Sequence, residues 1–386
     1  MKKILIFWLL AVYIISFTGC SPKAETNNGI WLTYYELNGI LNGNFEEELE
    51  TVIKNCKKAK IQNLYIHTRA FGDSLYSSDY FPLIENAKKY EYDVFSYILK
   101  ECKKSGLKVH AWINPYRIST STTNIDDIDV KSPAYKWLKD DKTENDSNVG
   151  FANGIYLNPA SKEVRALVVD GIRELIAKYE VDGIHFDDYF YPTTSEDFDR
   201  ASYEDYIKET SEPLSLEDWR RFNVNNLISD CYTAIKYADK DVIFSISPSA
   251  SLEQNYDNLY ADVKEWVQEG YIDEIIPQLY FGFLYPDERF RFENLLSEWK
   301  ILADNNPNVN LKIGLACYKA KPTLEADKAE WLANGDIIAR QAEICEKDSK
   351  VGGYVLFSYS SLFGADMEYT KQRENLMEYL NSGEDK

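Results

Sequence analysis

The sequence predicts an α/β protein that folds as a (β/α)8 TIM barrel with long rim loops after strands three and four. Three observations predict this class: eight short β-rich apolar runs, a helix-period segment after each run, and polar residues at the C-terminal ends of the runs. The alternative is an open doubly wound sheet. No G-x-G-x-x-G turn follows the first run, which disfavours that alternative.

The strands are assigned where apolar, β-branched and aromatic residues cluster over a few positions. In chain order they are GIWLTYYE from Gly29, NLYIHTR from Asn63, KVHAWINPY from Lys108, GIHFDDYF from Gly183, VIFSISPS from Val242, EIIPQLYF from Glu274, KIGLACY from Lys312 and GGYVLFSYS from Gly352. Helical periodicity follows the strands, for example in 45–60, 164–179, 219–238 and 334–346. The connections 117–154 and 193–218 are too long for turns, so we expect walls or lids of the site there.

The first twenty residues have the pattern of an export signal. Lys2 and Lys3 precede the apolar run 4–17, which is short for a membrane span. The ending FTGC resembles the bacterial lipobox, in which Cys20 becomes the lipidated first residue of the mature protein. We therefore expect a signal peptide (1–20), a tether (21–28) and one barrel domain (29–381). The predicted location is the cell envelope, with the lipid as the only membrane attachment and the domain facing the periplasm or the exterior.

The amino-acid composition limits the classes of molecule that the protein is expected to bind. The formal charge of −20 argues against nucleic acid, whose phosphates require Lys and Arg. The five cysteines other than Cys20 show no C-x-x-C spacing, so neither a zinc site nor a disulfide framework is predicted. The 29 Tyr and 8 Trp suit sugar binding, because flat rings pack on the apolar faces of pyranoses. Oligomeric state is left open.

The stretch VDGIHFDDYFYP, 181–192, sets Asp187 and Asp188 at the end of the fourth strand. Side chains alternate across a strand, so helix-facing Ile184 and Phe186 turn Asp187 into the barrel, while Asp188 lies where the chain leaves the strand and turns to the rim. The same alternation places further polar and aromatic side chains inside the barrel: His67, Arg69, His110, Trp112, Asn114, His185, Tyr189, Gln278 and Tyr280.

Structural roles compete with functional ones at several of these positions. Asp187 would form a buried salt bridge with Arg69, and Asp188 would cap the following loop. Trp112 would fill the barrel rather than bind sugar. The histidines would be structural, or His67, His110 and His185 would converge on a metal ion with an open position for water.

Several segments resemble the bacterial glycosyl hydrolase-like 10 family. They are GIWLT, FGDSLYSSDYFP, HAWINPYRI, YLNPASKEVR, YEVDGIHFDDYFYP, WRRFNVNNLI, SISPSA, IIPQLYF and IGLACY, in order from about residue 29 to about 360. The family includes a division-site lipoprotein that cleaves peptidoglycan glycan strands stripped of their peptides. The resemblance implies a barrel glycosidase with its acidic centre at Asp187 and Asp188.

The resemblance also implies binding or catalytic roles at other rim positions. These are Arg69, Asp73, Asn114, Tyr116, Arg117, Asn158, Gln278 and Tyr280. His110, Trp112 and Tyr189 are added as substrate-binding residues from their predicted inward orientation. The chain departs from the family at HTRA, from His67, where Gln-Val-Arg-Pro is common.

Glycoside hydrolysis needs a proton donor and, in most families, a second carboxylate. The segment DGIHFD is similar to the strand-four signature of family-eighteen chitinases, but Tyr189 stands where those enzymes carry their acidic Glu. One of Asp187 and Asp188 is therefore predicted to be the acid and the other its assistant. Asp73 is favoured as the second carboxylate over Glu36 and Glu253.

The predicted function is a cofactor-independent glycoside hydrolase acting on a bacterial polysaccharide, in first place peptide-free peptidoglycan strands. Two alternatives remain: a sugar-binding lipoprotein without turnover, and a metal-dependent hydrolase that uses the three histidines.

Overall fold

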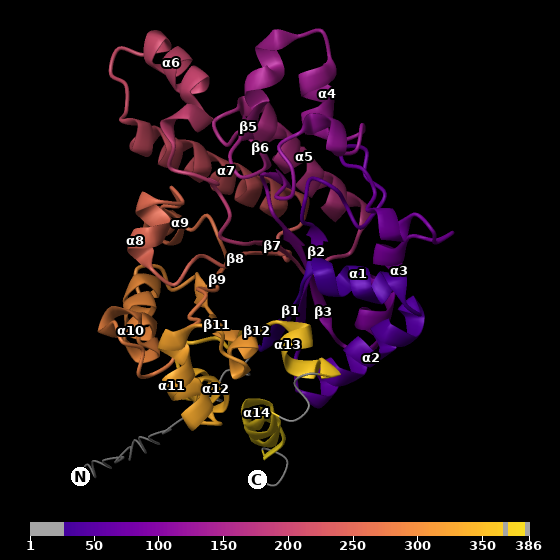
Figure 1. Cartoon of the computed structure of the whole chain (residues 1–386), viewed down its shortest axis with the longest axis vertical. Coiled ribbons are helices and arrows are strands. Elements are labelled where there is room, and N and C mark those ends of the chain that lie inside the picture. Colours follow the sequence, from indigo (N-terminus) through magenta and orange to yellow (C-terminus); the bar gives the residue numbers. More distant parts are fainter. Residues whose placement is uncertain (1–26, 366–369, 383–386) are drawn as a thin grey trace, which may run out of the picture.

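All eight predicted strands are present and pair in parallel around a barrel (Figure 1). They are β1 (Gly29–Leu32), β2 (Asn63–Arg69), β3 (Lys108–Ile113), β7 (Gly183–Phe186), β8 (Ile243–Ile246), β9 (Glu274–Ile275), β11 (Ile313–Ala316) and β12 (Tyr354–Phe357). The computed structural model describes residues 27–365 and 370–382, so the predicted signal peptide, Cys20 and most of the tether lie outside the described residues.

The seventh strand closes the barrel. β10 (Asn310–Leu311) pairs with β9, and after the single residue Lys312 the chain continues as β11, which pairs with β12. One bent strand thus bridges both edges of the sheet, and an isolated bridge from Gln278 to Gly314 adds to the closure. The predicted fold class is therefore confirmed.

Helices surround the barrel (Figure 1). They are α1 (Tyr34–Asn42), α2 (Phe45–Lys58), α3 (Val94–Lys104), α5 (Lys162–Lys178), α7 (Leu216–Ala238), α8 (Leu252–Asp257), α9 (Val263–Glu269), α10 (Phe292–Ala303), α11 (Glu325–Ala333), α12 (Ile337–Lys347), α13 (Tyr359–Phe363) and α14 (Lys371–Asn381). The predicted helical segments 45–60, 164–179, 219–238 and 334–346 correspond to α2, α5, α7 and α12 within a few residues.

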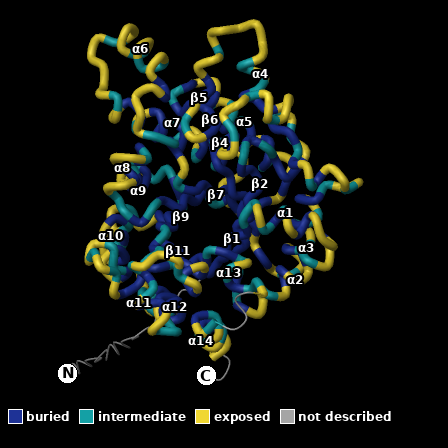
Figure 2. Tube along the Cα trace, in the orientation of Figure 1, coloured by how far each residue is buried: buried dark blue, intermediate teal, exposed yellow. Residues whose placement is uncertain are grey.

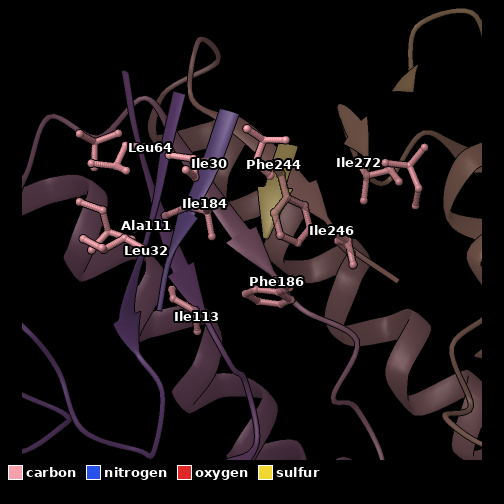
Figure 3. Close-up of a cluster of buried hydrophobic side chains, with 14 of the residues drawn as sticks. Ile30, Leu32, Leu64, Ala111, Ile113, Ile184, Phe186, Phe244, Ile246 and Ile272 are labelled. Atoms are coloured by element: carbon pink, nitrogen blue, oxygen red, sulfur yellow. The ribbon is translucent and has the colours of Figure 1, made fainter. Parts of the chain in front are cut away.

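The main apolar core lies between the strands and this helical layer. Alternate strand residues such as Ile30, Leu64, Ile184 and Phe244 are fully buried there, and Figure 3 shows them on neighbouring strands. The residues between them point into the barrel, where Trp31 belongs to a second, smaller aromatic cluster. The predicted alternation in the fourth strand is thus present.

Both long connections are ordered. The first contains β4 (Arg117–Ser119), α4 (Pro133–Lys139), β5 (Val149–Phe151) and β6 (Ile155–Leu157), which include an antiparallel sheet in the order β4-β6-β5. The second contains α6 (Arg200–Glu209). α4 and α6 project from the barrel in Figure 1, and Figure 2 shows their outer parts as exposed.

The cysteines of the domain are free and buried, as expected for small apolar residues. They are Cys56, Cys102, Cys231, Cys317 and Cys345. None of the helices in 27–365 and 370–382 combines the length and apolar character needed to cross a membrane.

Candidate active site

A cavity of about 200 Å³ opens at the C-terminal ends of the strands. Its polar lining residues are Thr33, His67, Arg117, Thr120, Asp187, Asp188, Ser247 and Gln278. Its aromatic lining residues are Trp31, Tyr34, Tyr35, Phe71, Trp112, Tyr189, Tyr280 and Phe357. The cavity therefore joins two carboxylates to aromatic walls at the end of the barrel where TIM-barrel enzymes carry their sites.

Asp187 is buried and held by three donors. The Trp112 Nε1–H donates to Oδ2 at 3.1 Å, and the Asn114 amide donates to Oδ1 at 2.9 Å. The backbone N–H of Tyr189 also donates to Oδ1, at 3.3 Å. Burial raises the pKa of Asp187, while the Arg117 charge and these hydrogen bonds oppose the rise. The side chain is thus fixed with both oxygens engaged.

Asp188 differs from its neighbour because fewer donors support its ionised form. Burial and the charge of Asp187 raise the pKa of Asp188 to about 7, and a hydrogen bond with Gln278 lowers it only in part. Two adjacent carboxylates whose environments separate their pKa values can divide acid and base roles. Of the two side chains, Asp188 therefore has the environment that favours the protonated form more strongly.

Arg117 begins β4, the first strand of the rim insertion. Its Nε–H donates to the Ala70 carbonyl at 3.0 Å, and its guanidinium lies 4.6 Å from the ring centre of Phe71 and 5.1 Å from that of Tyr189. The positive charge lowers the pKa of both aspartates. Arg117 thus joins the site as predicted, and it takes the place near Asp187 that was expected for Arg69.

The prediction that Arg69 lies at the barrel mouth is wrong. The pairing of β2 with β3 is irregular between His67 and Arg69, so the alternation shifts by one residue before Arg69. Arg69 is 1% exposed and stacks on Phe81 at 4.2 Å, with Nη1 pressed against Gly171 of α5. It therefore lies under the helical layer and forms no salt bridge with Asp187.

Four other predicted binding residues do not line the cavity: Asn114, which contacts Asp187, and three that lie farther from the pair. Tyr116 is 1% exposed within the main apolar core. The amide of Asn158 donates to the Ser147 carbonyl and to the Ser202 hydroxyl, which fixes the rim insertion. His110 lies deep in the barrel, where its ring stacks on Tyr65 with centroids 4.4 Å apart. None of these three residues lines the cavity of the two aspartates, so the structure does not bring them together with the pair as predicted.

The three histidines do not converge. His110 Nε2 contacts Asn63 Oδ1 at 3.1 Å, and His185 Nε2 accepts from Trp31 Nε1 at 3.0 Å. His67 stacks on Trp112 at 3.8 Å between ring centres. Across 27–365 and 370–382 no group of three or more His, Cys, Asp or Glu side chains is arranged to hold a metal ion. This geometry contradicts the alternative in which the three histidines hold a metal ion.

Asp73 faces a different cavity from Asp187 and Asp188. This adjoining cavity of about 410 Å³ shares Tyr34, Phe71 and other walls with the first. The Tyr34 hydroxyl donates to Asp73 Oδ2 at 3.3 Å, and burial raises the pKa of Asp73. Its placement argues against Asp73 as the second catalytic carboxylate.

The two other candidate carboxylates are also elsewhere. Glu36 closes a capping box at the start of α1: Thr33 Oγ1 accepts from the Glu36 N–H, and Glu36 accepts from the Thr33 N–H. Glu253 is exposed and lines a separate cavity under α8 and α9. Neither lines the cavity of the aspartate pair.

Sequence reasoning missed the aromatic wall that the first and last strands of the barrel contribute, which pair with each other. Trp31 of β1 and Phe357 of β12 line the cavity, and extending the inward alternation to these strands would have found them. Tyr34 and Tyr35 were placed in the first strand but belong to α1. The Thr-x-x-Glu pattern is typical of a helix N-terminus, so the start of this helix could have been predicted from it.

Comparison with known proteins gives one family and a consistent fold. The model of a family described as glycosyl hydrolase-like 10 matches residues 27–333. Glycosyl hydrolase YngK of Bacillus subtilis is 32% identical over 297 residues, covering 71% of this chain and 56% of that protein. Glycosyl hydrolase DigH of Escherichia coli K12 is 30% identical over 287 residues, covering 69% of this chain and 63% of that protein.

The matched part thus spans only 56% to 63% of the length of these two relatives. Among solved structures, the glycoside hydrolase domain of PgaB (BpsB) from Bordetella bronchiseptica superimposes with a TM-score of 0.59 and 13% identity. The superposition covers 90% of this chain and 98% of that domain. At this identity the likeness concerns the fold.

Proposed function

Because the chain belongs to the glycosyl hydrolase-like 10 family, we propose that it is a glycoside hydrolase that cleaves a bacterial polysaccharide, in first place peptide-free peptidoglycan glycan strands. One observation carries the proposal: the adjacent aspartates at the strand-four end lie in an aromatic cavity and have unequal environments. Such a pair supplies the proton transfer that glycosidic cleavage needs.

In this proposal Asp188 protonates the glycosidic oxygen as the bond from that oxygen to the anomeric carbon breaks. Asp187 stays ionised, since three donors hold its oxygens, and its negative charge stabilises the positive charge that develops on the sugar ring. Water then adds to the anomeric carbon and loses a proton to Asp188, which restores the acid. The aromatic side chains of the cavity bind the apolar faces of the sugar.

Asn114 is then a positioning residue. Its amide nitrogen donates to Asp187, while its oxygen accepts the backbone N–H groups of Tyr116 and Arg117. The residue thereby ties the orientation of the carboxylate to the turn after β3. Trp112 has a similar role through its indole N–H, whereas Gln278 acts on Asp188.

The test is mass analysis of products from peptide-free glycan strands and from common polysaccharides. Wild type should release defined oligosaccharides, and Asp187→Asn and Asp188→Asn should each lower the rate by roughly a hundredfold or more, the size of a lost acid–base group. Folded variants with near-normal turnover would contradict the assignment. Strands that are bound but never shortened would favour the sugar-binding alternative.

We further propose that the protein reaches its glycan as an envelope lipoprotein anchored through Cys20. The support is the signal-like sequence 1–20 with its FTGC ending. Radiolabelled fatty acid should be incorporated into wild type and not into Cys20→Ser. Equal labelling of both proteins would contradict the anchor.

A further inference from the structure

Arg117 is a positioned cation whose hydrogen-bonding capacity is mostly unused. A guanidinium has five N–H donors. In Arg117 only the Nε–H has a partner, the Ala70 carbonyl at 3.0 Å. No described residue accepts from either terminal nitrogen, and no described carboxylate lies within 4.0 Å of them. The guanidinium packs against the rings of Phe71 and Tyr189 at the cavity.

A second arginine of the same chain shows how the donors of a purely structural guanidinium are satisfied. Arg220 is fully buried, and its donors reach Asp199, Tyr260 and two backbone carbonyls. Arg221 provides another comparison, since it stacks on Tyr256 at 4.0 Å and also pairs with Asp218 at 2.6 Å. Arg117 also packs against aromatic rings, but unlike Arg221 it has no carboxylate partner. It borders a cavity that can admit an anionic ligand.

The charge at Arg117 is distinctive within the cavity. Among the described residues that line it, Arg117 is the one with a permanent positive charge, because burial lowers the pKa of His67 well below its usual value. The planar fork of an arginine matches a carboxylate in two parallel hydrogen bonds, and this pairing is stronger than one with a neutral acceptor. The acceptor that best fits the terminal nitrogens of Arg117 is thus a carboxylate of the bound ligand.

We infer that Arg117 binds a carboxylate carried by the substrate sugar, so that this site selects glycans with free carboxyl groups. This inference rests on the proposed function and names the feature of the glycan that is read. Two sources share this chemistry: the lactyl ether of muramic acid in peptide-free strands, and the carboxylate of a uronic acid.

The adjoining cavity gives the carboxylate a place away from Asp187 and Asp188. Phe71 and Thr120 border both cavities, Arg117 lines the first, and the next two residues of β4, Ile118 and Ser119, line the second. We place the sugar carboxylate on the Phe71 side of Arg117, away from the aspartate pair. A peptide attached to the lactyl group would convert the carboxylate into a neutral amide, and the ion pair would be lost.

The experiment compares one polymer in two charge states. Peptide-free glycan strands are used as prepared and after carbodiimide coupling of their carboxylates to methylamine, and kcat/KM is measured for wild type, Arg117→Gln and Arg117→Lys. For wild type, amidation should lower kcat/KM roughly ten- to a hundredfold, the size of a charged hydrogen-bonded contact. Arg117→Gln should cleave both strands with nearly equal kcat/KM, and Arg117→Lys should keep part of the preference.

The ratio between the two strands is the decisive readout, because any general effect of Arg117 on the aspartates cancels in it. Arg221→Gln is the matched control and should keep the wild-type ratio. Equal cleavage of both strands by wild type, or an unchanged ratio in Arg117→Gln, would overturn the inference.

A binding arm separates this inference from the proposed function. If wild type cleaves neither strand, the peptidoglycan proposal fails, and binding of an oligogalacturonate is measured by calorimetry. Binding that weakens tenfold or more in Arg117→Gln then supports a carboxylate site for uronic acids. Absence of carboxylate binding that depends on Arg117 overturns the inference as well.

Discussion

Both ends of the barrel bury charged groups. The N-terminal end pairs opposite charges, whereas the C-terminal end places two carboxylates side by side. At the N-terminal end, Lys312 Nζ lies 2.9 Å from Glu274 Oε1, with both side chains nearly inaccessible to solvent. At the C-terminal end, Asp187 and Asp188 are adjacent, and Arg117, whose charge lowers the pKa of both, forms no ion pair with them. Opposite charges in contact satisfy each other, whereas like charges side by side keep a proton available.

Size does not separate the two ends. A cavity of about 700 Å³ lies at the N-terminal end, lined by residues such as Asn63, Lys108 and Glu274, and it is larger than the cavity at the aspartates. The smaller cavity differs by its aromatic walls and by the carboxylate with a raised pKa. Residue chemistry therefore identifies the candidate site better than volume does.

The largest expected effect comes from breaking the pair at the N-terminal end. Lys312→Met leaves Glu274 as a buried unpaired carboxylate, so the free energy of unfolding should fall by about 3–5 kcal/mol. The kcat/KM of the protein that remains folded should stay near wild type, because the change is remote from the aspartates. Urea unfolding and initial rates measure the two quantities.

Two variants sharpen that result. Lys312→Met combined with Glu274→Leu should recover much of the stability, because no charge is then left unpaired. Lys103→Met removes an exposed partner of Glu180 and should change stability little. If Lys312→Met abolished turnover in fully folded protein, the division between a structural end and a catalytic end would be wrong.

The second largest effect comes from removing a hydrogen bond to Asp187 at the C-terminal end while both carboxylates stay in place. Trp112→Phe deletes the indole N–H that donates to Asp187, and loss of a hydrogen bond to a charged group costs about 1.5–3 kcal/mol. We expect kcat to fall roughly ten- to a hundredfold. Trp299→Phe is the matched control, since Trp299 is buried and donates to the Ala250 carbonyl outside the cavity. An equal loss of kcat in both variants would show a general packing effect.

The sequence predicted the barrel and the aspartate pair because both follow from short-range rules. Apolar alternation identifies strands, and it placed Asp187 correctly from Ile184 and Phe186. The same rule failed at Arg69, because the irregular pairing before it depends on contact with β3 rather than on local sequence. The separation of Asp73 from the pair depends on how Tyr34 and Phe71 divide two cavities, which requires the assembled fold.

The third effect concerns pH. Asp188 must be protonated to act as an acid, and its pKa is raised to about 7, so kcat/KM should be lost as pH rises through about 7, by about tenfold per further pH unit. At low pH the loss of the Asp187 negative charge should lower the rate again, and the two limits belong to the coupled pair. In Arg117→Lys the positive charge is retained, so the upper limit should move little. A rate that keeps increasing above pH 8 would exclude Asp188 as the proton donor.

The smallest effect is a gain in stability at the C-terminal end. The pKa of Asp188 is higher in the folded protein than the ordinary unfolded value of about 3.9, so folding disfavours its ionised form. This penalty is absent below about pH 4, grows as pH rises to about 7 and is constant above that. Asp188→Asn removes the ionised form and should raise the free energy of unfolding by about 1–2 kcal/mol at pH 8, with little gain at pH 4. Urea unfolding at the two pH values measures the difference, and a destabilised Asp188→Asn at pH 8 would mean that the Asp188 carboxylate stabilises the fold.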